Sequence, residues 1–202
     1  MKKLLITYFV LGVLCSFMIP LPNTYFKWGM EKLKIKDYKG AILDFTSAIK
    51  GDPSYEYGLA YEKRAYCKSK IKDYEGAILD LTKAIEILDY SDYHFSRGIC
   101  KYNLDDFRGA MFDFTQALKD DPKNEMIYFN LGLCKKNLGD SMGAIAEMDK
   151  AIKLNPKFEK AYYQRGLIEI NVGLKDMGCF DLSKAGELGY SDAYSRIKEL
   201  CN

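Results

Sequence analysis

Cysteine and histidine are the residue types best suited to nucleophilic, redox or metal chemistry, and this chain of 202 residues holds six cysteines and one histidine. Cys67, Cys100 and Cys134 recur about every 34 residues, without a C-x-x-C pair, and His94 has no second histidine beside it. Metal sites need several such ligands close together. The spacing therefore predicts a row of cysteines packed in the interior, where a small apolar side chain fits, and no metal site.

Catalytic motifs are also missing from the sequence. It contains no glycine-rich phosphate loop, no H-E-x-x-H, no G-x-S-x-G and no Ser-His-Asp set around His94. His94 occupies a position that other segments of the chain fill with tyrosine, so we expect it to replace a packing aromatic. These observations predict a protein that is not an enzyme and binds no cofactor.

Two rows of charged residues recur along the chain. The acidic row is Asp44, Asp80, Asp113, Glu147 and Asp181. The basic row is Arg64, Arg97 and Arg165, and it is interrupted by Trp28 and Leu131. The two rows predict a structural ladder of arginine–carboxylate pairs, within one unit or between units. If these pairs are exposed to solvent, each adds only about 0–1 kcal/mol to the stability of the protein.

The elements that position these residues are clearest between Tyr128 and Pro156. Apolar residues at helical spacing predict one helix that ends near Leu138 and a second from about Ser141 to Leu154. Similar stretches recur along the chain, and each contains a small residue in its second helix that serves as a reference position. In most copies, an aromatic lies sixteen residues before this small residue and a glycine or alanine lies twelve before it. A bulky apolar residue lies four residues after it. These small residues, which align the copies, are Ala41, Ala77, Ala110, Ala144 and Gly178.

A period near 34 with this pattern of small and large residues resembles the tetratricopeptide repeat, over roughly Pro22 to Tyr190. The resemblance implies an all-α, right-handed superhelical solenoid of about five helix-turn-helix repeats. Their expected bounds are 22–55, 58–90, 91–124, 125–158 and 159–190. Residues 191–202 are expected to form a helix that caps the apolar face of the last repeat. The ending from Asp181 onward resembles that of short bacterial tetratricopeptide proteins.

The N-terminus has the layout of a bacterial secretory signal: Met1-Lys2-Lys3, the apolar run Leu4 to Ile19, and then Pro20. As a helix, that run would span roughly 24 Å, less than the ~30 Å hydrocarbon core of a bilayer. We therefore expect residues 1–21 to be a cleaved signal and the protein to be exported to the periplasm or cell surface. The alternatives are a membrane anchor through residues 4–19, lipidation at Cys15, and an apolar cap on a cytosolic protein. In an oxidising compartment, Cys179 and Cys201 are the pair to test for a disulfide.

The charge balance argues against one class of partner. Lysine and arginine total 30 and aspartate and glutamate total 28, so the formal net charge is +2. Nucleic-acid binding calls for a basic stripe, and this average is nearly neutral. We expect no nucleic-acid partner.

The resemblance implies that the first helices line a concave groove. Spacing of i, i+4 places on one helical face the residues that would face it, which are Phe26, Met30, Glu62, Tyr66, Phe95, Ile99, Tyr102, Phe129, Leu133, Tyr163, Leu167 and Ile170. Asn130 and Lys160 match the carboxylate-binding set of some family members, with Arg165 as a further polar contact. Phe95, Ile99 and Gln164, however, replace the Lys, Asn and Arg of that set, so an apolar or amphipathic segment is the expected ligand. The alternative is that neighbouring first helices bury these residues against one another.

The predicted function is a non-catalytic protein–protein interaction scaffold that holds a peptide or protein segment in this groove. One alternative is a structural spacer or self-assembling element whose groove holds its own N-terminal segment or another copy. A second is a regulatory subunit of an enzyme complex. Repeat folds serve many functions, so the fold by itself names no partner.

Overall fold

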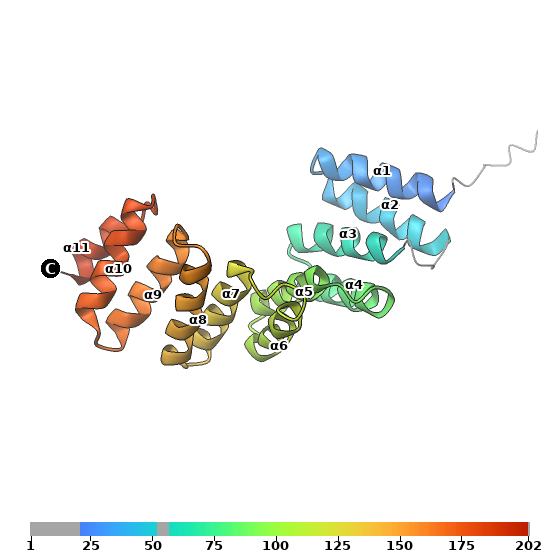
Figure 1. The fold of residues 1–202 in the computed structure, drawn as a ribbon. Helices are drawn as coiled ribbons and strands as arrows, with labels where there is room; N and C mark the ends of the chain where they lie inside the picture. The colour runs from blue at the N-terminus through green and yellow to red at the C-terminus, as the bar shows by residue number, and fades with distance from the viewer. Residues whose placement is uncertain (1–20, 52–56, 202) are drawn as a thin grey trace, which may run out of the picture.

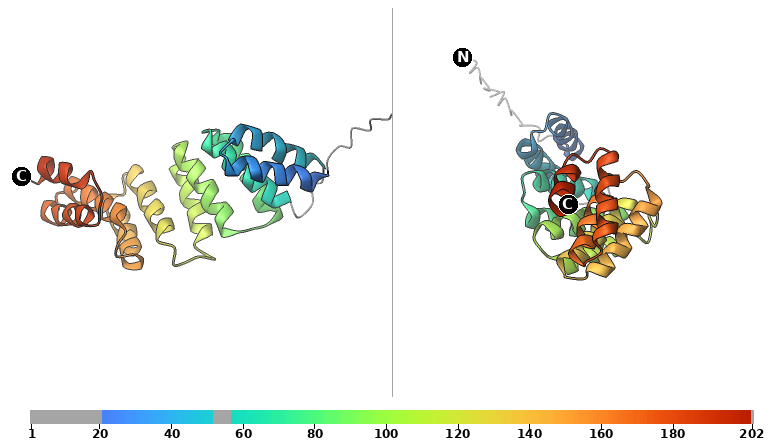
Figure 2. Two further views of the ribbon diagram at one scale, coloured as in Figure 1. Left: turned by 90° about the horizontal axis from the view of Figure 1, so that it is seen from above. Right: turned by 90° about the vertical axis from the view of Figure 1, so that its left-hand side faces the viewer.

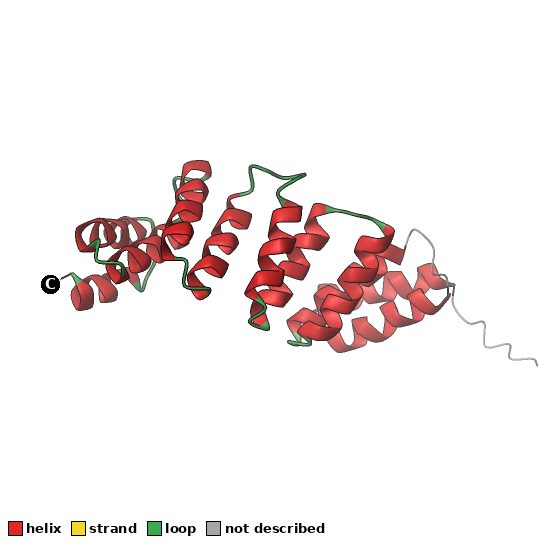
Figure 3. Cartoon of the chain, turned by 90° about the horizontal axis from the view of Figure 1, so that it is seen from below, coloured by secondary structure: helices red, strands yellow, loops and turns green. Residues whose placement is uncertain are grey.

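The computed structural model of this chain describes residues 21–51 and 57–201. Within these residues the fold is all-α, with eleven helices and no strand (Figure 1, Figure 3). The apolar N-terminal run and Cys15 lie outside the described residues. In the described part, no helix combines the length and the apolar character needed to cross a membrane.

The helices form five consecutive pairs followed by a single helix. They are α1 (Pro22–Lys34), α2 (Tyr38–Gly51), α3 (Tyr57–Lys70), α4 (Tyr74–Ile87), α5 (Ser91–Asn103), α6 (Phe107–Ala117), α7 (Glu125–Asn137), α8 (Ser141–Leu154), α9 (Glu159–Asn171), α10 (Lys175–Glu187) and α11 (Ala193–Leu200). Each pair is one helix-turn-helix repeat, as the sequence predicts, and the predicted second helix from Ser141 to Leu154 coincides with α8.

The turns inside the second, third and fourth repeats share a local chemistry. The carboxylates of Asp73, Asp106 and Asp140 cap α4, α6 and α8, each accepting a hydrogen bond from the backbone N–H three residues later. These bonds satisfy N–H groups that lack a partner inside the helix. The residue before the cap takes a left-handed conformation, for example Gly139 with φ +84°. The sequence pair Gly139-Asp140 thus ends one helix and begins the next.

Close packing inside each repeat depends on small residues opposite large ones. A Cβ atom added at Gly98 would lie 2.7 Å from Cε1 of Phe114, so only glycine lets α5 approach that ring. Ala110 and Ala117, on the same helix as Phe114, are fully buried. The aligned glycines, alanines and aromatics of the sequence therefore mark the contact between the two helices of a repeat.

The repeats stack into an elongated array whose described ends lie far apart (Figure 1). The end-on view in Figure 2 shows the helix pairs winding around a common long axis. Each buried cluster draws its residues from one repeat and its immediate neighbours. In such an array each repeat is stabilised mainly by the repeats beside it.

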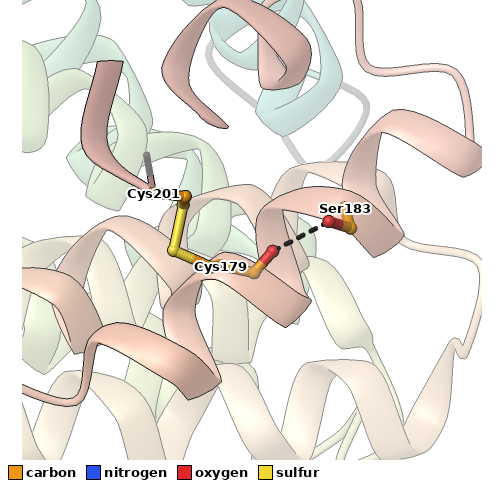
Figure 4. The surroundings of a disulfide bond; sticks show 3 residues. All are labelled: Cys179, Ser183 and Cys201. Atoms are coloured by element: carbon orange, nitrogen blue, oxygen red, sulfur yellow. Dashed lines mark hydrogen bonds between the residues drawn. A yellow bond between two sulfur atoms is a disulfide. The ribbon is translucent and has the colours of Figure 1, made fainter. Parts of the chain in front are cut away.

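The C-terminal end is closed by α11, which is shorter than the predicted segment 191–202. Ala193 is fully buried in the cluster that includes Leu182 and Ala185 of α10. A disulfide bond joins Cys179 of α10 to Cys201 just after α11 (Figure 4). The one pair that the sequence marks for a disulfide test is therefore bonded, and it fastens the capping helix to the last repeat.

Candidate functional site

The predicted ladder of arginine–carboxylate pairs is present. Each arginine of the row makes two hydrogen bonds to the carboxylate sixteen residues later: 2.8 and 2.6 Å for Arg64 with Asp80, 3.0 and 2.7 Å for Arg97 with Asp113, and 2.6 and 2.9 Å for Arg165 with Asp181. The expectation that such pairs are exposed is wrong, because these three carboxylates are buried. Each pair satisfies charges that would be costly to bury alone.

The arginines also link each repeat to the one before it. The third guanidinium nitrogen, Nη1, donates a hydrogen bond to the preceding repeat. Arg64 donates to Thr46 and Arg97 donates to Thr82, both at 3.1 Å, and Arg165 donates to Asp149. The ladder therefore runs both within a repeat and across to its neighbour, which supports the structural interpretation of the two charged rows.

A row of lysines, which the sequence analysis missed, completes the ladder. Lys32, Lys68, Lys101 and Lys135 lie 2.7–2.9 Å from the acids Asp44, Asp80, Asp113 and Glu147. They stand four residues after the arginine positions, so Lys32 and Lys135 supply the cation where Trp28 and Leu131 interrupt the basic row. The i, i+4 spacing is the signal that could have revealed them.

The balance of forces on these acids is clearest at Asp113. Burial acts to raise its pKa, but hydrogen bonds and charge from Arg97 and Lys101 outweigh burial and hold the pKa below its ordinary value. Asp113 is therefore an ionised structural acid at neutral pH.

The predicted cysteine row is confirmed as buried packing. Cys67, Cys100 and Cys134 are buried and free. Burial raises the pKa of Cys67 and of Cys100 to about 11 and that of Cys134 to about 12. Thiolate is the nucleophile, so these thiols are poorly suited to redox or catalytic chemistry.

His94 lies beside the ladder. Its side chain is largely covered, as expected for a residue that replaces a packing aromatic, and Nε2 lies 2.6 Å from Oδ1 of Asp89. Its Nδ1 is 3.6 Å from Oδ1 of Asp113. In the described part of the chain, no group of three or more His, Cys, Asp or Glu is arranged to hold a metal ion.

Four of the predicted groove residues, Glu62, Tyr66, Phe95 and Ile99, line a pocket between α3 and α5, which we name the groove pocket. It measures about 210 Å³ and is lined by Glu62, Ala65, Tyr66, Ser69, Lys70, Leu81, Phe95, Ser96, Ile99 and Cys100. Tyr66 is 43% exposed, and its ring forms part of both this pocket and the hollow beside it. Its ring centroid lies 4.9 Å from Nζ of Lys70. An apolar floor with charged and hydroxyl groups at its edge suits an amphipathic ligand.

A second hollow of about 250 Å³ adjoins the groove pocket and shares Tyr66 with it. It lies between α1 and α3 and carries three lysines, Lys34, Lys36 and Lys63. The surface around Tyr66 is therefore apolar on one side and basic on the other.

The C-terminal half of the predicted groove is filled by the chain itself. Phe129 packs on Phe158, with ring centroids 5.0 Å apart, and Tyr163 packs on Tyr190 at 4.3 Å. Asn130 is buried and donates from Nδ2 to the carbonyl of Met126 at 2.7 Å. In this half the groove residues are buried, as the alternative expects, but the rings that cover Phe129 and Tyr163 come from connecting segments and not from neighbouring first helices.

The remaining predicted groove residues are partly buried, with the exception of Lys160. Phe26 and Met30 are partly buried against the cluster around Phe45. Tyr102 packs on Phe107, and its hydroxyl accepts a hydrogen bond from Asn137 at 3.0 Å. Leu133 and Leu167 are partly buried beside Phe129 and Tyr163, whereas Lys160 is exposed.

The tetratricopeptide repeat family model matches residues 114–146. The crystal structure of MamA has a TM-score of 0.76 and 24% sequence identity, over 82% of this chain and 96% of that one. MamA residues 41 to the end, from Desulfovibrio magneticus RS-1, give 0.78 and 16%, over 84% and 96%.

YrrB, described as a TPR protein with an unusual peptide-binding site, matches with a TM-score of 0.74 and 18% identity, over 86% of this chain and 90% of its own. No curated protein is detectably similar in sequence. The chain thus has the tetratricopeptide repeat fold, with the architecture of MamA and YrrB. This fold is typical of proteins that bind other proteins and is generally not catalytic.

Proposed function

We propose that this chain is a non-catalytic binding module that holds a segment of another protein in the groove pocket. The observation that carries the proposal is the exposure of Tyr66 beside Phe95 and Ile99, at a junction between two repeats. Apolar surface enclosed by polar groups is characteristic of interaction sites. The peptide-binding site named for YrrB, a protein of the same fold, supports the proposal by likeness.

The surroundings of Tyr66 specify the ligand. An aromatic or branched side chain of the partner fits against Phe95 and Ile99, where it loses contact with water. Lys34 and Lys63, in the adjoining hollow, favour an acidic group a few residues away in the partner. The ligand class is therefore a short amphipathic segment that combines an apolar anchor with negative charge.

Capture of a partner protein from an extract of the source cell tests the groove pocket as a binding site. Residues 22–202 serve as bait beside a Tyr66→Ser/Phe95→Ser variant and a Phe112→Ser control, because Phe112 is exposed on α6 outside the pocket. All baits must first show equal helical circular dichroism. We expect a protein that the parent and Phe112→Ser retain and the double variant loses. Equal retention by all three would refute the site, and capture of a second copy of this chain would favour self-assembly.

Charge reversal tests the acidic part of the ligand. Lys34→Glu/Lys63→Glu leaves the apolar floor intact and is expected to weaken capture at least tenfold at low salt. Lys198→Glu, on α11, reverses one charge at the far end of the array and serves as the control. Undiminished capture by the double variant would remove the acidic requirement while leaving the groove pocket in place.

We also propose that the protein is exported, with residues 1–21 as its leader. The Cys179–Cys201 disulfide supports this proposal, because disulfides persist in oxidising compartments and are rare in the cytosol. Fractionation of the source cell, with mass spectrometry of the N-terminus and of the linked cysteine peptides, tests it. A full-length cytosolic protein with both cysteines reduced would contradict it.

A further inference from the structure

The fifth repeat departs from the ladder at one position. Four repeats place a lysine beside their buried acid, but at the equivalent position α9 carries Glu169. The repeat therefore has an added negative charge where the other four have a positive one.

A pocket of about 490 Å³ lies at this position, between α8, α9 and α10; we name it the acidic pocket. Among the described residues, the charged groups that line it are Asp149, Glu169, Asp176 and Asp181 with a single cation, Arg165. Arg165 is already engaged by Asp181 and Asp149, and its Nε lies 3.9 Å from Oε1 of Glu169.

Glu169 is the group that points to a ligand. Its side chain is buried, with 2% of the residue exposed, and its Oε2 has no hydrogen-bond partner within residues 21–51 and 57–201. A buried carboxylate oxygen without a donor is costly, so such atoms normally find a partner. Glu169 is one of the residues that line the acidic pocket.

The other walls of the pocket are apolar. Ile145, Met177 and Phe180 line it, and Met177 and Phe180 are exposed. An unbranched aliphatic chain that ends in a cation matches both features, since lysine buries its methylene stem and keeps its ammonium group among polar partners. The carboxylates do not form a metal-binding group in the described chain, which favours an organic cation.

We propose that the acidic pocket binds the ammonium group of a lysine side chain from a partner protein, in place of the lysine that the other repeats supply themselves. The ammonium pairs with the carboxylate of Glu169 and is attracted by Asp149 and Asp176, and its stem lies on Met177 and Phe180. This inference rests on the proposed role in protein binding. The acidic pocket shares no residue with the groove pocket, so each site can fail independently of the other.

The charge state of Glu169 makes the binding depend on pH. Burial raises the pKa of Glu169 to about 7; the charges of Asp181 and Asp149 act in the same direction, as does a hydrogen bond that the protonated carboxyl makes with Asp181, and Arg165 acts against them. The groups that face it are Asp149 from α8, Arg165 from α9, and Asp176 and Asp181 from α10. A cation binds the ionised form, so affinity is expected to rise as pH increases through 7 and to fall on acidification.

Methyl NMR with a small lysine probe tests the proposal. The probe is Nα-acetyl-lysine N-methylamide, and its norleucine analogue, which lacks the ammonium group, is the matched control. In the full chain, the Met177 methyl signal should shift saturably with the lysine probe and not with the analogue. Met126, on α7 outside the pocket, should not respond.

Two variants complete the test. Glu169→Lys restores the residue type of the other four repeats and should abolish the shift, whereas the nearly isosteric Glu169→Gln should weaken binding at least fivefold and remove its pH dependence. Tyr66→Ser should leave the shift unchanged. The proposal is overturned if the parent gives no shift, if the analogue matches the lysine probe, or if Glu169→Lys binds like the parent. Tighter binding of 1,4-diaminobutane than of the lysine probe would overturn the assignment to a protein partner.

Discussion

The groove is open between α3 and α5 but filled between α7 and α9, and the two regions differ at equivalent positions. Glu62 of α3 occupies the position that Phe129 holds in α7. Phe158, at the N-cap of α9, packs on Phe129, whereas Tyr90, at the equivalent N-cap of α5, packs on Tyr93 and is 50% exposed. The groove is therefore covered where an N-cap aromatic packs on an aromatic of the preceding first helix, and open where that helix carries Glu62.

The comparison shows that repeat register and surface availability are separate properties. Register determines which residues face the groove, because it follows from helical periodicity. Availability depends on the segments between repeats, which vary from one repeat to the next. A binding site in a repetitive fold is therefore found where a connecting segment leaves a repeated position uncovered.

The largest expected loss of stability follows from replacing Phe158, the residue that covers Phe129. Phe158→Ala should destabilise the protein by about 3–5 kcal/mol, as for other large buried aromatics, because it removes the partner of Phe129 and leaves a cavity. Tyr66→Ala should cost less than about 1 kcal/mol, because its ring is exposed already. Urea unfolding followed by circular dichroism measures both variants. Equal losses would mean that the two halves of the groove are packed alike.

The second effect concerns the fastening of the C-terminal half. Cys201→Ser removes the cross-link that holds α11 near Tyr190, the cover of Tyr163. A disulfide that closes a loop of this length contributes about 3 kcal/mol, mainly by restricting the unfolded chain. Hydrogen exchange should then show faster exchange in α10 and α11, with α3 and α5 unchanged. Unchanged exchange in α11 would show that its packing suffices without the cross-link.

The third effect compares equivalent glycines. Gly98→Ala sets a Cβ 2.7 Å from the buried ring of Phe114, whereas Gly132→Ala meets the flexible end of Met148 at 2.9 Å and the backbone oxygen of Ala144 at 3.2 Å. Overpacking costs about 1–3 kcal/mol and the helical preference for alanine returns up to about 1 kcal/mol. We expect a net loss of about 1–2 kcal/mol for Gly98→Ala and a smaller loss, below about 1 kcal/mol, for Gly132→Ala. Thermal unfolding of both variants checks this order, and the reverse order would contradict it.

The smallest change in stability should have the clearest effect on binding. Glu62→Phe gives α3 the aromatic that α7 has at Phe129, and it should fill the groove pocket, which Glu62 lines. The pair that Glu62 makes with Lys63 contributes less than about 1 kcal/mol. Glu62→Gln loses the same pair but leaves the pocket open. Capture should fail with Glu62→Phe and persist with Glu62→Gln; retention by both would separate the filling of the pocket from binding.

The sequence predicts the fold well because each part of the repeat has a local cause. The turn at Gly139-Asp140 and the contact between Gly98 and Phe114 follow from residue types at fixed spacing. The arginine ladder was predicted for the same reason.

The site is predicted only in part, because coverage is a tertiary property. Tyr66, Phe95 and Ile99 meet at the groove pocket as expected, but the burial of Phe129 and Tyr163 depends on Phe158 and Tyr190 in connecting segments. Glu169 illustrates a different omission: its departure from the lysine row is visible in the sequence only after that row has been recognised.

Site-specific photo-cross-linking in the source cell tests whether the groove pocket binds the partner. A photoreactive benzoylphenylalanine replaces Tyr66 in one strain and Tyr194, an exposed tyrosine of α11, in another. We expect a covalent adduct with a single partner from position 66, its loss when Glu62→Phe is added, and no such adduct from position 194. The same adducts from both positions, or an adduct from position 194 alone, would contradict the assignment of the groove pocket as the binding site.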